Sequence, residues 1–231
     1  MTKAGNGESA QPGARLLDLV AVMDRLRTEC PWDAKQTHAT LAPYLLEESY
    51  EAVDALESGD QAALREELGD VLLQVAFHAR IAAERTDGTG WTIDDVAGGI
   101  VDKLMRRHPH VFGDVSVSGA DEVSQNWDAI KAAERAARGG SPASAFDGVP
   151  LGQPALSLAA QLRRRAERAG LPDELAELPP GPAVSDIGAE LFALVGRARA
   201  AGLDPELELR SAARSYRDRV LAWEQERREP G

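Results

Sequence analysis

The chain has 231 residues, a formal net charge of −12 at pH 7 and a hydrophobic content of 43%. Its acidity argues against a protein that binds nucleic-acid polymers or anionic membranes. Its single cysteine, Cys30, excludes an intrachain disulfide. The sequence shows no signal-like segment and no membrane-length apolar run, so we expect a cytoplasmic protein. Abundant Ala, Leu, Glu and Arg favour helices.

The N-terminal part predicts a tail, a helix and a loop. Residues 1–13 are rich in Gly, Ser, Gln and Pro and are expected to be disordered. Apolar residues then repeat at helical spacing, and the helix should end before Pro31. In the loop that follows, Trp32 either stacks against a planar ligand or plugs the end of a helical bundle. Thr40 is expected to cap the next helix.

Two acidic helices are predicted between Leu41 and Ile81, and both place carboxylates on apolar rows. On the first helix Glu48 lies within the apolar stripe, and Glu51 lies at its edge. On the second, Glu67 borders the apolar stripe, and Asp70 shares a row with Gln74, Phe77 and Ile81. A buried unpaired carboxylate costs several kcal/mol or becomes neutral. We therefore expect the two helices to face each other and to share a cation.

The spacing of these carboxylates predicts a metal site made of Glu48, Glu51, Glu67 and Asp70. Residues three apart are neighbours on a helix surface, so two such pairs can converge. Oxygen ligands favour Mg²⁺ or Mn²⁺ over zinc, and Mg²⁺ commonly takes phosphate oxygens as further ligands. A solvated acidic face is the alternative. A di-iron bundle is less favoured because such bundles use Glu-x-x-His pairs.

A third helix, expected from Ile93 to about Arg107, continues an apolar row with cations. Thr92 and Asp95 form a capping-box variant at its start. Lys103 and Arg107 lie on the row that begins with core residues, and Arg106 is adjacent. These cations either bind an anion such as a polyphosphate or form a solvated cluster that the helix dipole favours.

A further helix is expected from near Trp127 to about residue 138, with Trp127 and Lys131 on one face.

Together these motifs closely resemble the MazG family of nucleoside triphosphate pyrophosphohydrolases, from about Leu16 to Arg135. The resemblance rests on the order and spacing of four sequence segments, which are Cys30-Pro-Trp-Asp33 with Gln36-Thr37, Glu47-Glu-Ser-Tyr-Glu51, Glu67-Leu-Gly-Asp70 and Lys103-Leu-Met-Arg-Arg-His-Pro-His-Val-Phe112. It implies an all-α bundle, usually an intertwined homodimer, that hydrolyses NTPs or dNTPs to a nucleoside monophosphate and pyrophosphate with Mg²⁺, for which Mn²⁺ is a possible substitute.

By position, the resemblance assigns metal binding to the four carboxylates. It gives Glu47 a role in ordering or deprotonating metal-bound water, so Glu47, Glu48 and Lys103 are the expected catalytic residues. Substrate binding is expected from six residues, which are Trp32, Lys103, Arg106, Arg107, Trp127 and Lys131. Ala63 stands where some members carry a phosphate-binding Lys. The alternative function is a non-catalytic nucleotide-binding or regulatory module.

The second half of the chain resembles a degenerate copy of the first. We expect a catalytic domain at 14–135, a Gly/Ser/Pro-rich linker at 136–155 and a degenerate helical region at 156–231. Residues 186–195 can be laid over residues 67–76, which puts Ala189 where Asp70 would be. Within the second region no helix with an EExxE pattern precedes residues 186–195. The second region should therefore not build the metal site and is expected to pack or dimerise. Chance similarity between two Leu/Ala-rich helices is the alternative.

Overall fold

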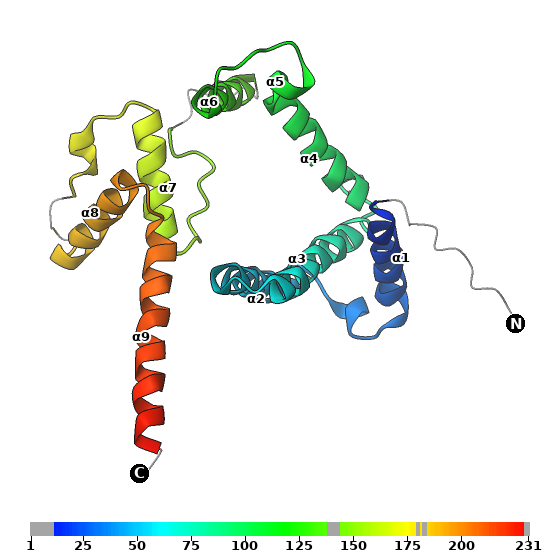
Figure 1. Ribbon diagram of the computed structural model, residues 1–231. Helices are drawn as coiled ribbons and strands as arrows, with labels where there is room; N and C mark the ends of the chain where they lie inside the picture. Colours follow the sequence, from blue (N-terminus) through cyan, green and yellow to red (C-terminus); the bar gives the residue numbers. More distant parts are fainter. Residues whose placement is uncertain (1–11, 138–143, 179–180, 182–183, 229–231) are drawn as a thin grey trace, which may run out of the picture. The chain divides into compact units, whose positions relative to one another are not determined.

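The computed structural model describes residues 12–137, 144–178, 181 and 184–228, and it confirms the all-α prediction (Figure 1). Within these residues the only strand-like feature is an isolated bridge between Gly181 and Val184. The chain divides into two compact units, residues 1–130 and 131–231. No helix in the described part of the chain is long and apolar enough to cross a membrane.

The first unit contains six helical elements and most of a seventh, which continues into the second unit. In chain order they are α1 (Ala14–Glu29), η1 (Asp33–Lys35), α2 (His38–Ser58), α3 (Gln61–Ala82), α4 (Ile93–Arg107), α5 (Pro109–Phe112) and α6 (Ala120–Ala137). The bounds of α4 and its Thr92–Asp95 capping box agree with the sequence prediction. Helix α6 begins seven residues before Trp127, so the predicted start was wrong.

Helices α2 and α3 form a tight antiparallel hairpin (Figure 1). Helix α2 starts earlier than expected, because Thr37 rather than Thr40 is its N-cap. The Thr40 amide donates to Thr37 Oγ1 at 3.2 Å, and the Thr37 amide donates to Thr40 Oγ1 at 2.9 Å. At the turn, Gly59 adopts a left-handed conformation with φ of 75°, and Asp60 caps α3 by accepting from two backbone amides. This short turn fixes α3 beside α2.

A small core joins α1 to the hairpin. The buried side chains of Met23, Leu41, Ala76 and Phe77 form one cluster that draws on α1, α2 and α3. Gln74 is also buried, with 5% of its surface exposed. The row that contains Gln74 and Phe77 therefore faces inward, as its sequence pattern predicts, and it leads along α3 to Asp70.

Arg27 ties three segments of the first unit together. Its side chain is only 9% exposed and pairs with Glu84, just after α3, at 2.8 Å. It also donates to the backbone oxygens of Asp33 and Gln36 around η1. The hydrogen bond from Arg27 lowers the pKa of the Glu84 carboxyl. The loop that carries Trp32 is thus held by a nearly buried cation.

The ion pair between Arg27 and Glu84 should make stability depend on pH. A lowered pKa in the fold means that the stabilisation is present at pH 7 and is lost as pH falls through the folded-state pKa, below 4.5. We expect Glu84→Gln to lower the free energy of unfolding at pH 7 by about 2 kcal/mol. Denaturant unfolding at pH 7 and at acid pH measures this, and the difference from wild type should shrink in acid.

The control for this prediction is Glu29→Gln. Glu29 pairs with Arg25 at 2.9 Å, but both side chains are more than half exposed. We expect this change to cost about 0.5 kcal/mol or less. Equal effects of the two substitutions would contradict the role given to the Arg27 pair.

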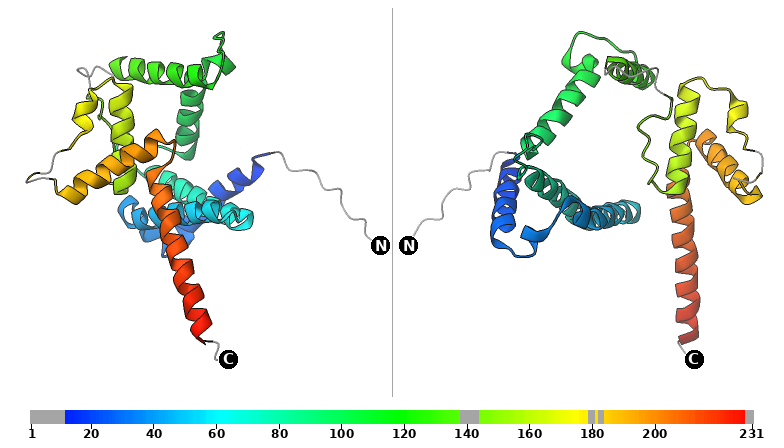
Figure 2. Two further views of the ribbon diagram at one scale, coloured as in Figure 1. Left: turned by 60° about the vertical axis from the view of Figure 1, so that its left-hand side comes forward. Right: turned by 180° about the vertical axis from the view of Figure 1, so that it is seen from behind.

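The second unit contains α7 (Ala155–Arg168), η2 (Asp173–Ala176), α8 (Asp186–Ala200) and α9 (Pro205–Arg228). Helix α7 packs against α8 and α9 (Figure 2). Between α7 and α8 the described residues contain η2 but no long helix that would correspond to α2. Of the expected disordered tail, residues 1–11 lie outside the described residues, as do residues 138–143 of the expected linker. The domain division therefore stays a prediction.

Candidate metal centre

The hairpin brings three carboxylates from two helices together. Glu48 of α2 and Glu67 and Asp70 of α3 each offer one oxygen, and these oxygens lie within 4.8 Å of one another. All three side chains are half-buried. The i, i+3 spacing of Glu67 and Asp70 puts both on the side of α3 that faces α2. The fold thus produces the convergence that the sequence pattern predicts for these three residues.

Glu51 and Glu47 lie beside this trio rather than within it. The charge of Glu51 acts on both Glu48 and Glu67. Both Glu47 and Glu51 are exposed on α2. Of the four predicted ligands, three therefore converge directly, and Glu51 lies at the edge of the group.

The electrostatics of the cluster show that it lacks positive charge. Loss of hydration, followed by the charges of Asp70, Glu51 and Glu47, raises the pKa of Glu48. Loss of hydration and the charges of Glu51 and Asp70 likewise raise the pKa of Glu67. Neighbouring carboxylates that repel one another in this way bind a proton or a cation favourably. An all-oxygen donor set of this kind fits a hard divalent cation.

Trp32 lies at the edge of the small core. Its ring meets Tyr44 edge-on at 6.0 Å and Phe77 at 6.5 Å, yet half of its surface is exposed. The Trp32 carbonyl accepts a hydrogen bond from Gln36 at 3.0 Å. The contacts with Tyr44 and Phe77 agree with a packing role, and the exposed half leaves room for a stacking role.

The predicted cations are placed on a different part of the unit. Lys103 and Arg106 are exposed on α4, and the half-buried Arg107 lies 5.3 Å from the centre of the Trp127 ring. Lys131 follows Trp127 by four residues on α6. Helix α4 starts near the end of α3 and leads away from the α2–α3 hairpin toward α5 (Figure 1). Within one chain, the cations on the last turns of α4 therefore lie away from the carboxylates of the hairpin.

Two histidine contacts were missed by sequence reasoning. The ring of His108 meets Trp127 edge-on at 4.9 Å, and its Nδ1 lies 2.7 Å from the Leu104 carbonyl oxygen. Nδ1 of His78 lies 2.7 Å from Nδ1 of His38, and the two rings stack. The contacts between His108 and Trp127 and between His38 and His78 have no local sequence signature, because each depends on how separate helices pack.

With this geometry in place, comparison with known proteins shows the family. Residues 36–112 match the family described as the MazG nucleotide pyrophosphohydrolase domain. The chain is 38% identical over 233 residues to the "Nucleoside triphosphate pyrophosphohydrolase/pyrophosphatase MazG" of Thermotoga maritima, and this match covers 93% of the chain and 88% of the relative. The chain belongs to the MazG family.

Other relatives are more similar in sequence. An "Uncharacterized 26.1 kDa protein in blaB 3'region" from Streptomyces cacaoi is 52% identical over 213 residues, which is 92% of this chain and 84% of the relative. A "Nucleoside triphosphate pyrophosphohydrolase" from Mycolicibacterium smegmatis is 47% identical over 210 residues. That match covers 91% of this chain but only 59% of the mycobacterial protein.

The carboxylate cluster predicts that a divalent cation stabilises the fold. At a free Mg²⁺ concentration about 100 times its Kd, a single site adds about 2.7 kcal/mol. We expect Mg²⁺ to raise the melting temperature of the wild type and to have little effect on Asp70→Asn. Differential scanning calorimetry with Mg²⁺ and with EDTA measures this.

Glu66→Gln is the matched control, because Glu66 is an exposed neighbour on α3 outside the converging trio. It should keep the full Mg²⁺ effect. A wild-type protein that melts at the same temperature with saturating Mg²⁺ and with EDTA would exclude a metal site at the hairpin.

Proposed function

We propose that this chain hydrolyses nucleoside triphosphates, NTP or dNTP, to a nucleoside monophosphate and pyrophosphate in a reaction that requires Mg²⁺, with Mn²⁺ as a possible substitute. The observation that carries the proposal is the convergence of Glu48, Glu67 and Asp70 within 4.8 Å in a chain of the MazG family. Two of the relatives compared above are named as nucleoside triphosphate pyrophosphohydrolases. Housekeeping of the nucleotide pool is the physiological role that fits this activity.

In this proposal Glu48, Glu51, Glu67 and Asp70 hold the metal. Bound Mg²⁺ supplies charge neutralisation at the phosphates and lowers the pKa of a coordinated water. Glu47 is exposed one residue before Glu48, where its carboxylate orients the attacking water or accepts its proton. The remaining contribution of the chain is positioning, because phosphoryl transfer depends mainly on alignment and charge stabilisation.

Substrate binding is assigned to the cations and the tryptophans. Lys103 and Arg107, with Arg106 beside them, hold the triphosphate and stabilise the departing pyrophosphate, since guanidinium groups match phosphate oxygens in bidentate geometry. The half-exposed ring of Trp32 is the proposed stacking surface for the base. Trp127 and Lys131 provide further nucleotide contacts.

A homodimer completes this arrangement. Helix α4 has no buried residue, although it carries five large apolar side chains that are 37% to 51% exposed, namely Val96, Ile100, Val101, Leu104 and Met105. An isolated helix of this length is marginal in water, so α4 needs a partner surface. A second copy of the chain covers this face and brings the cations at the end of α4 to the carboxylates of the other protomer.

The activity is tested by removing the carboxylates one at a time. Glu48→Gln and Asp70→Asn should each lower kcat/KM by roughly 100-fold or more, which is about 2.7 kcal/mol of transition-state stabilisation. Phosphate release from a panel of NTPs and dNTPs, with pyrophosphatase added, measures turnover. Helicity, followed by circular dichroism, should be unchanged.

Glu66→Gln should retain near wild-type activity in the same assay. A wild-type protein that binds NTP but releases no pyrophosphate would instead support the non-catalytic module. Full activity in both carboxylate variants would overturn the site assignment.

The dimer is tested by charging the apolar face of α4. Ile100→Glu should convert a dimer to a monomer and lower activity, because a buried unpaired carboxylate costs several kcal/mol. Size-exclusion chromatography with light scattering gives the mass.

Asp102→Asn serves as the control, since residue 102 lies about 200° around the helix from residue 100. It should leave the dimer intact. A monomeric wild-type protein with full activity would show that the second copy is not needed.

A further inference from the structure

The second unit contains a cavity of about 1140 Å³ that the proposed hydrolysis does not use. It lies between α7, the segment around η2, and α8, and its lining includes Arg163, Glu174, Glu177 and Gly196. Pockets for small organic ligands commonly have volumes of about 300–1,000 Å³. This cavity is therefore large enough for a mononucleotide-sized molecule.

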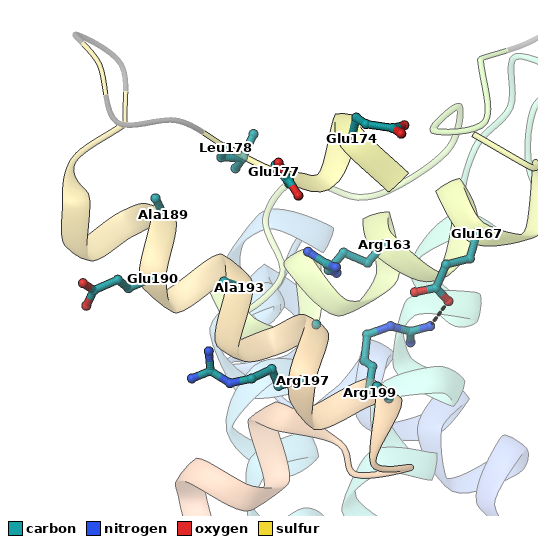
Figure 3. A pocket seen from close by; sticks show the side chains of 12 residues that line it. Arg163, Glu167, Glu174, Glu177, Leu178, Ala189, Glu190, Ala193, Arg197 and Arg199 are labelled. Atoms are coloured by element: carbon teal, nitrogen blue, oxygen red, sulfur yellow. Dashed lines mark hydrogen bonds and ion pairs between the residues drawn. The ribbon is translucent and has the colours of Figure 1, made fainter. Parts of the chain in front are cut away.

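Arg163 lies in the cavity wall. Its side chain reaches from α7 toward α8 (Figure 3), and its guanidinium carbon lies 5.1 Å from the centre of the Phe192 ring. Its Nε atom is buried and has no hydrogen-bond acceptor within the described residues, and the same holds for Nε of Arg199 on the same wall. A buried donor without an acceptor costs about 1–3 kcal/mol. The guanidinium of Arg163 therefore has hydrogen-bonding capacity at the cavity wall that the described residues do not use.

Gly196 makes room for this guanidinium. A Cβ atom at residue 196 would lie 2.5 Å from Nη2 of Arg163 and 2.6 Å from its Cζ. When residues 186–195 are laid over residues 67–76, Gly196 falls at the position of Phe77, which is buried in the core of the first unit. A glycine and a guanidinium thus replace an apolar contact, and the change adds positive charge at the cavity wall.

The other charged groups of the cavity restrict what it can bind. Arg199 is already paired with Glu167 at 2.6 Å, and Arg163 and Arg197 also line the cavity. Glu174 and Glu177 lie on the opposite wall (Figure 3). A bare anion would be repelled by these two carboxylates. A ligand with an anionic group at one end and hydroxyl or amino donors at the other can pair with Arg163 on one wall and with the two carboxylates on the other.

We propose that this cavity binds an organic phosphate of mononucleotide size, with its phosphate on Arg163 and its hydroxyl or amino donors toward Glu174 and Glu177. The site binds without hydrolysing, because Ala189 stands where the first unit has Asp70, and within the described part of the second unit no helix like α2, with its carboxylates, precedes α8. It is thus a second small-molecule site, separate from the α2–α3 cluster.

The test measures AMP binding to the full chain in EDTA, which removes divalent metal from the first unit. Calorimetry gives the affinity, and hydrogen exchange with mass spectrometry locates the protected peptides. We expect protection within residues 155–200, and Arg163→Gln should weaken binding at least about 10-fold. Arg164→Gln is the matched control, because Arg164 is exposed on the same helix, and it should bind like the wild type.

A second variant keeps the charge of Arg163 and changes only the space beside its guanidinium. Gly196→Ala should also weaken AMP binding, since the added methyl displaces the guanidinium, and it still tests the site if Arg163→Gln fails to fold. Adenosine and inorganic phosphate should each bind more weakly than AMP.

Four results would overturn the proposal. These are the absence of saturable AMP binding, protection confined to α2 and α3, binding unaffected by both variants, or adenosine or phosphate binding as tightly as AMP. None of these results bears on hydrolysis, because the α2–α3 cluster is kept free of metal throughout.

Discussion

Repulsion between carboxylates across one helical hairpin is the constraint on which the first unit depends. Glu48, Glu67 and Asp70 are held within 4.8 Å of one another although their charges oppose it. The hairpin keeps this arrangement because Leu41, Phe77 and their neighbours pack farther along the same helices. Packing energy therefore maintains an electrostatic arrangement that binding of a proton or a cation relieves, as the proposed metal site requires.

The two units show how the same helical pattern can serve different chemistry. In the first unit the inward row of α3 joins Asp70 to Phe77 and so links the carboxylate cluster to the core. In the second unit the matching positions on α8 are Ala189 and Gly196. Under the predicted relation between the two units, the second lacks the carboxylate needed for metal binding, and Gly196 makes room for Arg163 where the first unit has an aromatic ring. A charged side chain thus occupies space that a core residue fills in the first unit.

Residue pattern was enough to predict the helices and the convergence of three carboxylates, because both follow from helical periodicity and short-range spacing. Position along a helix determines which residues share a face, so the inward row of Asp70, Gln74 and Phe77 could be read directly. The start of α6 was missed, although Val123 precedes Trp127 by four residues and so lies on the same helical face. The stacked pair of His38 and His78 and the cavity at Arg163 also escaped prediction, because they depend on contacts between helices that no local pattern encodes. The roles of the individual site residues stay predictions.

The connection between α2 and α3 has a consequence for how such a sequence can change. Only Gly59 and Asp60 separate the two helices, and one additional residue within α3 would turn everything beyond it by about 100°. An insertion between Asp60 and Asp70 would thus carry Asp70 out of line with Glu48 while leaving the helical content almost unchanged. Insertions and deletions should therefore be tolerated in the long connections before α4 and α6 far more readily than in this part of the chain.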